Sequence, residues 1–301
     1  MTALIAPWGE RQKADFLKRP LKFEHGLADT VLFADEALVR LLDRWPHELY
    51  DINLFDFDDD GNAVLQTGVR GRTSGEKVLE GIKEGRVWVQ LRRADQGYPE
   101  LGAAMRAAFE GIAGQVRGFS PLNLNAQLIM SAPQAKVAFH ADAPGVILFH
   151  MRGKKRLWVY PNDEAHMPQA QMENIALKQQ TEDLPYARRM DAAAEVFDLA
   201  PGDALAWPLH SPHRIENLGE FNVSLSVDYQ TWDSRIINGA HYANGLMRRA
   251  GLPVASMGRT PMAARAALWA VHLALKRLAL VDDRIKGLDR SFELDGEPVR
   301  A

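Results

Sequence analysis

The 301-residue chain carries 36 basic and 39 acidic residues, a formal net charge of −3 and a pI near 6.3. This near-neutral balance predicts no general attraction to nucleic acid. The chain contains no cysteine, which excludes disulfides and thiolate metal sites, and we expect a cytoplasmic protein. No uncharged run reaches the length of a membrane span, and the first residues lack the pattern of a signal peptide.

The first 120 residues carry helix and strand signals in turn and are expected to form a mixed α/β region. Apolar residues recur at helical spacing over residues 35–45, and Pro46 ends that pattern. Ser74 is a suitable N-cap for a second helix over residues 75–84, because its hydroxyl can accept a hydrogen bond from a free backbone N–H. A strand over residues 85–92 and a helix over residues 99–112 are expected to follow.

An acidic segment between two expected strands imitates the start of a calcium-binding EF-hand loop. Residues 56–61 have the sequence Asp-Phe-Asp-Asp-Asp-Gly, but the twelfth position of the loop is Thr67, where the motif needs glutamate. The flanking residues also carry a strand pattern instead of a helical one. The segment is therefore predicted to be a hairpin turn.

Residues 139–160 contain a candidate metal half-site. His140 and Asp142 stand two positions apart, and side chains at that spacing on an extended strand leave the same face. An imidazole and a carboxylate supply two ligands of a 2-His-1-carboxylate site, which leaves coordination positions open on Fe(II). The two strands later in this segment are expected to form a hairpin that carries the site. A surface histidine beside a surface aspartate, with nothing bound, is the alternative.

The third ligand is expected to come from residues 199–229. There a Pro-Gly-Asp turn at residues 201–203 leads to a short apolar run, two histidines and an alternating strand. His210 and His213 are both candidates for the ligand. His150 has no partner at ligand spacing and is expected to be structural or to lie at the rim of the site.

Lys155 is expected to bind an anion inside the fold. It shares one face of a predicted strand with Leu157 and Val159, and a lysine among core residues is costly unless an anion neutralises it. A bound dicarboxylate would provide that charge. The alternative is that Lys155 only solvates a turn, which is the role assigned to Lys154 and Arg156.

Over residues 122–232, a little over a third of the chain, these motifs resemble the jumonji-C or cupin-like family of Fe(II)- and 2-oxoglutarate-dependent hydroxylases. The shared pattern is His-x-Asp, a Gly-x-Lys-Arg turn, a Pro-Gly-Asp turn and a histidine just before the outgoing strand. The resemblance implies a double-stranded β-helix, or jelly-roll. It also implies that His140, Asp142 and His213 hold Fe(II), and that Lys155 binds the far carboxylate of 2-oxoglutarate.

Two positions differ from the asparaginyl hydroxylase branch of that family. Val137 stands where a threonine contacts the distal carboxylate, and Asp228 stands where an asparagine lies near the other end of the co-substrate. Asn125 alternates with Asn123 and Gln127 on the preceding strand, and these amides could replace the missing donors or simply be polar strand residues. Asp228 is expected to turn away, to be protonated or to belong to a different substrate site. Asn125 and Asp228 are the further candidates for contact with the co-substrate.

Two segments lie outside this pattern. Residues 163–195 form a polar insertion that either covers the site and contacts substrate or is a variable solvent loop. Beyond residue 233, Thr260 and Pro261 mark the start of a helix that extends over residues 262–283. The broad apolar face of this helix predicts that it packs on the jelly-roll or forms a two-fold interface, and we expect a homodimer.

The chain is thus expected to be mainly β with flanking helices. It divides into an N-terminal α/β region over residues 1–120, a cupin-like jelly-roll over residues 121–232 and a C-terminal helical region over residues 233–301. The expected function is Fe(II)- and 2-oxoglutarate-dependent hydroxylation of a protein side chain or a small molecule. A cupin metalloenzyme that does not use 2-oxoglutarate, and a non-enzymatic ligand-binding or regulatory protein, are the alternatives.

Overall fold

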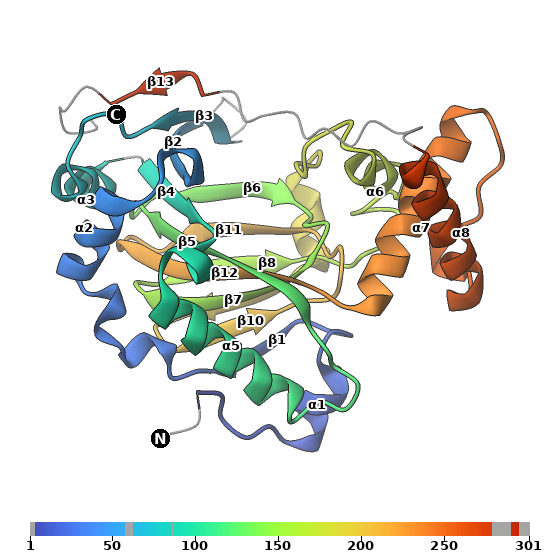
Figure 1. Cartoon of the computed structure of the whole chain (residues 1–301), viewed down its shortest axis with the longest axis horizontal. Helices are drawn as coiled ribbons and strands as arrows, with labels where there is room; N and C mark the ends of the chain where they lie inside the picture. The colour runs from blue at the N-terminus through green and yellow to red at the C-terminus, as the bar shows by residue number, and fades with distance from the viewer. Residues whose placement is uncertain (1–3, 58–62, 86, 279–289, 295–301) are drawn as a thin grey trace.

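The computed structural model of the chain describes residues 4–57, 63–85, 87–278 and 290–294. Within them two β-sheets pack face to face, and helices cover the outer face of the larger sheet (Figure 1). The strands are β1 (Leu21–Glu24), β2 (Tyr50–Phe57), β3 (Ala63–Val69), β4 (Val87–Arg92), β5 (Leu122–Ser131), β6 (Lys136–His140), β7 (Gly145–Arg152), β8 (Lys155–Val159), β9 (Glu195–Leu199), β10 (Asp203–Ala206), β11 (His213–Asn217), β12 (Asn222–Gln230) and β13 (Phe292–Glu293). The α-helices are α1 (Glu10–Asp15), α2 (Asp35–Arg44), α3 (Gly75–Glu84), α4 (Ala94–Gly97), α5 (Pro99–Ala113), α6 (Gln169–Ala176), α7 (Trp232–Arg249) and α8 (Met262–Arg277).

The two sheets confirm the predicted jelly-roll. In the described part of the chain the larger sheet has the order β1-β10-β7-β12-β5-β4-β2-β3-β13, and the smaller sheet has the order β6-β11-β8-β9. Strands β5 to β12 are divided equally between the two sheets, as a double-stranded β-helix requires. The N-terminal strands β2 to β4 extend the larger sheet beyond β5, so the predicted α/β elements continue the same sheet.

The larger sheet is buried on both faces. Phe149 of β7 lies in a core shared with α2, α3 and α5, whereas its neighbour Leu148 packs between the sheets with Leu157 of β8. This alternation follows from the two-residue period of a strand. Burial of each such side chain contributes about 1.5–3 kcal/mol, so the strands that carry the site rest on a large apolar core.

The local signals of the N-terminal region predicted several of its elements correctly. Helix α2 ends at Arg44, and the Ser74 side chain accepts the Lys77 N–H at the start of α3. Strands β2 and β3 pair antiparallel, as predicted for a hairpin. The acidic turn between them, residues 58–62, lies outside the described residues.

The expected hairpin of β7 and β8 is wrong, because the two strands belong to opposite sheets. Gly153 makes the sharp turn between them with φ of +77°, and a Cβ at this position would lie 2.4 Å from the carbonyl oxygen of Phe221. The sequence shows two strands joined by a tight turn. This pattern is the same whether the two strands pair in one sheet or the chain crosses at the turn from one sheet to the other. Lys155 nevertheless faces inward with Leu157, because the crossing keeps that face of β8 between the sheets.

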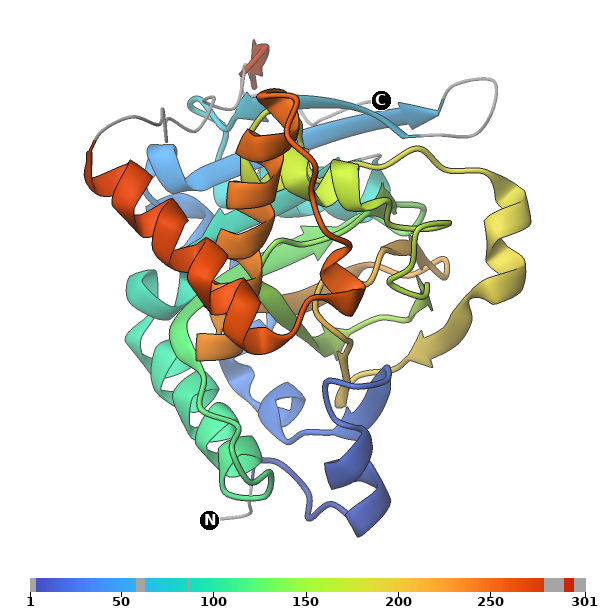
Figure 2. The same cartoon turned by 90° about the vertical axis from the view of Figure 1, so that its right-hand side faces the viewer.

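Two helices, α7 and α8, form an antiparallel pair at one end of the sheets (Figures 1 and 2). They approach closely at Gly239, where a Cβ would lie 2.2 Å from the Trp269 ring. Helix α8 contains no buried residue and ends at Arg277, and residues 279–283 of the longer predicted helix lie outside the described part of the chain. None of the described helices combines the length and the apolar character that crossing a membrane requires.

Candidate metal centre

The sheet register brings two histidines together. His140 is the last residue of β6, His213 is the first residue of β11, and the two are direct partners in the antiparallel pairing of these strands. Their ring centroids lie 4.1 Å apart. Directly opposed side chains on neighbouring strands are close enough to bind one ion.

Asp142 completes the cluster from the loop after β6. Its Oδ1 lies 3.8 Å from His140 Nε2, and its Oδ2 lies 3.5 Å from His213 Nε2. One ligand atom from each of the three residues falls within 4.8 Å of the others. Asp142 was predicted to share a strand face with His140, but it lies just past the end of β6, where the irregular backbone turns its carboxylate toward both rings.

Backbone carbonyls orient both rings for ligation. His140 Nδ1 lies 2.8 Å from the Ala138 carbonyl oxygen, and His213 Nδ1 lies 3.2 Å from that of Ser211. A carbonyl can only accept, so each Nδ1 carries the proton and each Nε2 presents its lone pair toward Asp142. This second contact is the one that metal-bound histidines ordinarily make.

The donor set fits a divalent cation. Asp142 Oδ2 is buried and accepts no hydrogen bond from the described residues. Burial, with the nearby charges of Glu182 and Asp228, raises the pKa of the Asp142 carboxyl well above its ordinary value. Burial and the neighbouring His140 lower the pKa of His213. A cation between these groups would offset the cost of burying the carboxylate and would keep the imidazoles neutral.

Lys155 lies inside the jelly-roll with only 4% of its surface exposed. Burial lowers the pKa of its ammonium to about 7. No hydrogen bond or ion pair links its side chain to another described residue. A buried cation without such a partner is costly, and a bound anion would lower that cost. Its location and isolation match those expected of a residue that binds a carboxylate.

The other two co-substrate candidates contact each other. Asn125 of β5 and Asp228 of β12 are direct cross-strand partners, and Asp228 Oδ2 accepts hydrogen bonds from Asn125 Nδ2 at 3.3 Å and from Gln127 Nε2 at 3.0 Å. Burial raises the pKa of Asp228 to about 6. Asn123 does not join this group, because its side chain donates to Gln230 at the exposed end of the strands. Two of the three amides proposed as replacement donors, Asn125 and Gln127, therefore already donate to Asp228.

The remaining histidines lie outside the cluster. His210 Nε2 donates to Asn238 Oδ1 at 2.6 Å, and Asn238 Nδ2 donates to the carbonyl of Ala143 at 2.8 Å. His150 is fully buried between the hydroxyl of Ser224 and the carbonyl of Gly153, and burial lowers its pKa to about 3. The structure thus brings His213, and not His210, to His140 and Asp142.

Sequence reasoning missed Glu182 of the insertion. Its Oε1 accepts the N–H of Ala143 at 2.9 Å, one residue beyond the ligand Asp142. The insertion is polar and carries no periodic pattern, so no signal in the sequence places one of its acids here. The alternative that the insertion is a solvent loop is wrong, since it packs around Phe139 and Tyr160 in a separate apolar cluster.

The fold and the site correspond to a known class. Residues 71–234, more than half of the chain, match the family model of the cupin-like domain, and the chain therefore belongs to this family. The match begins well before the resemblance seen in the motifs and includes α3, β4 and α5.

Solved structures show the same fold. A structure of ycfD from E. coli is 19% identical, with a TM-score of 0.53 over 93% of this chain and 69% of that chain. A structure of the Escherichia coli ribosomal oxygenase YcfD is 18% identical, with a TM-score of 0.52 over 93% of this chain and 68% of that one. No curated protein matches the sequence significantly.

Proposed function

We propose that the protein is an Fe(II)- and 2-oxoglutarate-dependent oxygenase that hydroxylates a protein side chain or a small molecule. The observation that carries this proposal is the convergence of His140, Asp142 and His213, with the two Nε2 atoms 3.8 and 3.5 Å from the carboxylate oxygens of Asp142 and with Oδ2 accepting no hydrogen bond from the described residues. Two imidazoles and one carboxylate are the ligand set of non-haem Fe(II) oxygenases. The similar YcfD structure is described as a ribosomal oxygenase, which supports the same class of reaction.

Each residue has a distinct task in this proposal. His140, Asp142 and His213 would hold Fe(II) on one side and leave its other positions for the co-substrate and dioxygen. Lys155 would pair with the far carboxylate of 2-oxoglutarate, because it is a buried cation on the inner face of β8. Bound iron and 2-oxoglutarate would supply the oxidising chemistry, and the jelly-roll interior would keep bulk water away from it.

Consumption of 2-oxoglutarate tests the proposal. Wild-type protein supplied with Fe(II), dioxygen and 2-oxoglutarate is expected to form succinate slowly even without substrate. Lys155→Ala is expected to raise the KM for 2-oxoglutarate, whereas Lys154→Ala, at an exposed neighbouring position, is expected to leave it unchanged. Succinate formation that did not require Fe(II), or an unchanged KM in Lys155→Ala, would contradict these assignments.

Asp228 favours a second candidate, a cupin metalloenzyme that does not use 2-oxoglutarate. The side-chain amides of Asn125 and Gln127 already donate hydrogen bonds to Asp228. The negative charge of Asp228 would also repel a dicarboxylate. A protein that bound metal but showed no affinity for 2-oxoglutarate would support this second function over the first.

A further inference from the structure

The insertion between β8 and β9 contacts the strands of the candidate metal centre at two points. At the first point it adds a short antiparallel bridge to the end of β6. The N–H of Leu184 donates to the carbonyl of Phe139 at 3.0 Å, and the N–H of Ala141 donates to the carbonyl of Glu182 at 3.1 Å. These two bonds hold the backbone on both sides of the ligand His140.

The carboxylate of Glu182 strengthens this contact. Its Oε1 accepts the N–H of Ala143 at 2.9 Å, in the loop that carries Asp142. One residue of the insertion therefore bonds to the ligand loop through its backbone and through its side chain. The loop contains no regular structure of its own, so these bonds restrict where the Asp142 carboxylate can lie.

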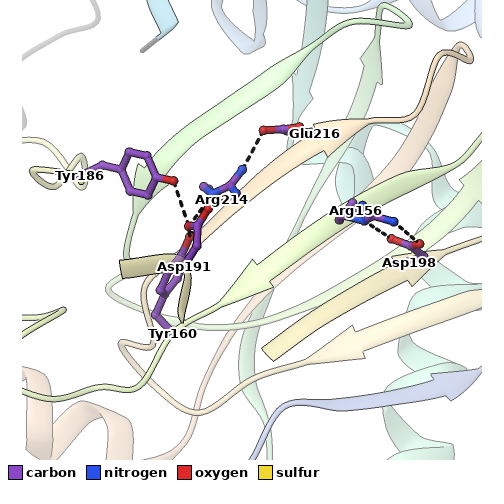
Figure 3. Close-up of polar contacts among 7 residues, drawn as sticks. All are labelled: Arg156, Tyr160, Tyr186, Asp191, Asp198, Arg214 and Glu216. Atoms are coloured by element: carbon purple, nitrogen blue, oxygen red, sulfur yellow. Dashed lines mark hydrogen bonds and ion pairs between the residues drawn. The ribbon is translucent and has the colours of Figure 1, made fainter. Parts of the chain in front are cut away.

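The second point lies on the outer face of the smaller sheet (Figure 3). Arg214 follows the ligand His213 on β11, and successive side chains of a strand leave opposite faces. Arg214 Nη2 donates to Asp191 Oδ2 of the insertion at 2.8 Å, and Arg214 Nε donates to the hydroxyl of Tyr160 at 2.9 Å. The hydroxyls of Tyr160 and Tyr186 both donate to Asp191 Oδ1, at 2.5 and 2.9 Å.

The Arg214 guanidinium is held from two more directions. Its Nη1 donates to Glu216 at 2.7 Å, and its Cζ lies 3.5 Å from the centre of the Trp158 ring. Only 13% of the Arg214 side chain is exposed. A planar guanidinium with several fixed partners is far more rigid than a solvated ion pair. The Arg156–Asp198 pair on β8 and β9, with 41% and 54% of the side chains exposed, is such a solvated pair (Figure 3).

Apolar side chains fill the space between the two points. The cluster consists of Phe139, Ala141, Tyr160, Met167, Met172, Ile175 and Leu184. Tyr186 also packs on Phe139, with ring centroids 5.7 Å apart. The insertion therefore packs on Phe139 and Tyr160 between the two points, and close packing can transmit a displacement from one point to the other.

We infer that residues 182–191, which we call the clasp, set the geometry of the metal centre. In this inference Arg214 and Asp191 are positioning residues that act through the clasp on His140 and Asp142. The inference rests on the metal binding that the proposed function requires. Its physical basis is that the clasp joins the two ligand strands by a second route, in addition to their direct pairing in the sheet.

Metal affinity tests this inference. Co(II) is added anaerobically to the full-length metal-free protein, and the visible absorption of the bound ion reports both affinity and ligand geometry. We expect Arg214→Gln and Asp191→Asn each to weaken Co(II) binding by about tenfold and to alter the absorption band, as loss of a partner that orients ligands does. Arg156→Gln is the matched control, since it removes an ion pair from the same sheet face, and it is expected to bind Co(II) as the wild type does.

Two further measurements separate positioning from loss of folding. Circular dichroism and the thermal midpoint establish that the variants remain folded, and Tyr186→Phe provides a milder change because it removes only one hydroxyl from Asp191. The double variant Arg214→Gln/Asp191→Asn is expected to bind Co(II) no more weakly than either single variant, since both act through one contact. Trypsin is expected to cleave at Arg188 and Arg189 faster in both single variants than in the Arg156→Gln control.

The outcomes distinguish this inference from the proposed function. The inference would be overturned if folded Arg214→Gln and Asp191→Asn bound Co(II) with wild-type affinity and wild-type visible absorption. It would also be overturned if the Arg156→Gln control lost as much Co(II) affinity as these variants. Normal Co(II) binding with the expected clasp effects, but no use of 2-oxoglutarate, would contradict the proposed function and leave the inference standing. A wild type that bound no Co(II) would overturn both.

Discussion

His140 and His213 face each other across two antiparallel strands, and both rings are fixed by the same local contact. In each, Nδ1 donates to the backbone carbonyl two residues earlier, at Ala138 and at Ser211. The pairing of the strands sets the separation of the rings, and the backbone contacts set their orientation. The sheet therefore pre-forms the two-histidine part of the candidate metal centre.

Loss of one imidazole is expected to abolish metal binding. His140→Ala leaves one histidine and one carboxylate, and we expect its affinity for Co(II) to fall by more than 100-fold. Co(II) at about 100 times its Kd should stabilise the wild type by about 2.7 kcal/mol and the variant hardly at all. Differential scanning calorimetry with and without Co(II) measures this difference. His47→Ala, which changes an exposed histidine, should retain the full stabilisation.

Lys155 is expected to lower the stability of the protein when no ligand is bound. Its pKa is about 7 in the folded chain and near 10.5 in the unfolded chain, so between these values the unfolded state binds more protons. The free energy of unfolding should therefore rise with pH from about 7 to about 10. Lys155→Met should remove this rise and stabilise the metal-free protein at pH 7 by on the order of 2 kcal/mol, while weakening 2-oxoglutarate binding.

Denaturant unfolding at a series of pH values measures this effect. The nearby His150 contributes little to it, because its pKa of about 3 in the folded chain and its ordinary value of 6.5 in the unfolded chain both lie below this range. Lys154→Met, in which an exposed lysine is changed, serves as the control and should keep the wild-type pH dependence. A Lys155→Met protein less stable than the wild type at pH 7 would show that the ammonium has a partner in the folded chain.

Asp228 is expected to limit the affinity for 2-oxoglutarate. Asp228→Asn removes a negative charge that acts on Asp142, and we expect 2-oxoglutarate to bind several-fold more tightly to the variant. Calorimetric titration of the metal-loaded protein tests this expectation. Asn123→Ala, which alters a side chain at the exposed end of the same strand pair, should have no effect. Weaker binding to Asp228→Asn would mean that the acid belongs to the binding site.

Helix α8 is expected to form the interface of a homodimer. Val271 and Leu278 are 51% and 66% exposed, and they share the outward face of α8 with small residues. These small residues are Ala263, Ala267, Ala270 and Ala274. A charge on this face, as in Val271→Glu, should convert the dimer to a monomer in light scattering after gel filtration. Val31→Glu, at an 82% exposed position distant from α8 in the sequence, should leave the dimer intact.

Local chemistry predicted much of the fold from the sequence. The Ser74 cap, the proline at the start of α5 and the alternation along β8 are short-range signals, and each produced the expected element. The candidate metal ligands could be predicted for a similar reason, since the His-x-Asp motif and the histidine before a strand are each local. The register of β6 against β11 then places the two histidines opposite each other.

Long-range pairing could not be predicted in the same way. The sequence around Gly153 shows a tight turn between two strands, and it does not distinguish a hairpin from a crossing between sheets. Glu182 reaches the metal loop through backbone bonds of an insertion without periodicity. The hydrogen bonds of Asp228 to Asn125 and Gln127 likewise depend on the register of β12 against β5.

The most direct test of the proposed oxygenase is an anaerobic titration of the Fe(II)-loaded protein with 2-oxoglutarate, followed by visible absorption. Chelation of Fe(II) by the keto acid should produce a saturable charge-transfer band, which should be absent from His140→Ala and should require more 2-oxoglutarate in Lys155→Ala. Iron bound at the site without any such band would contradict the account and would assign the protein to a different cupin chemistry.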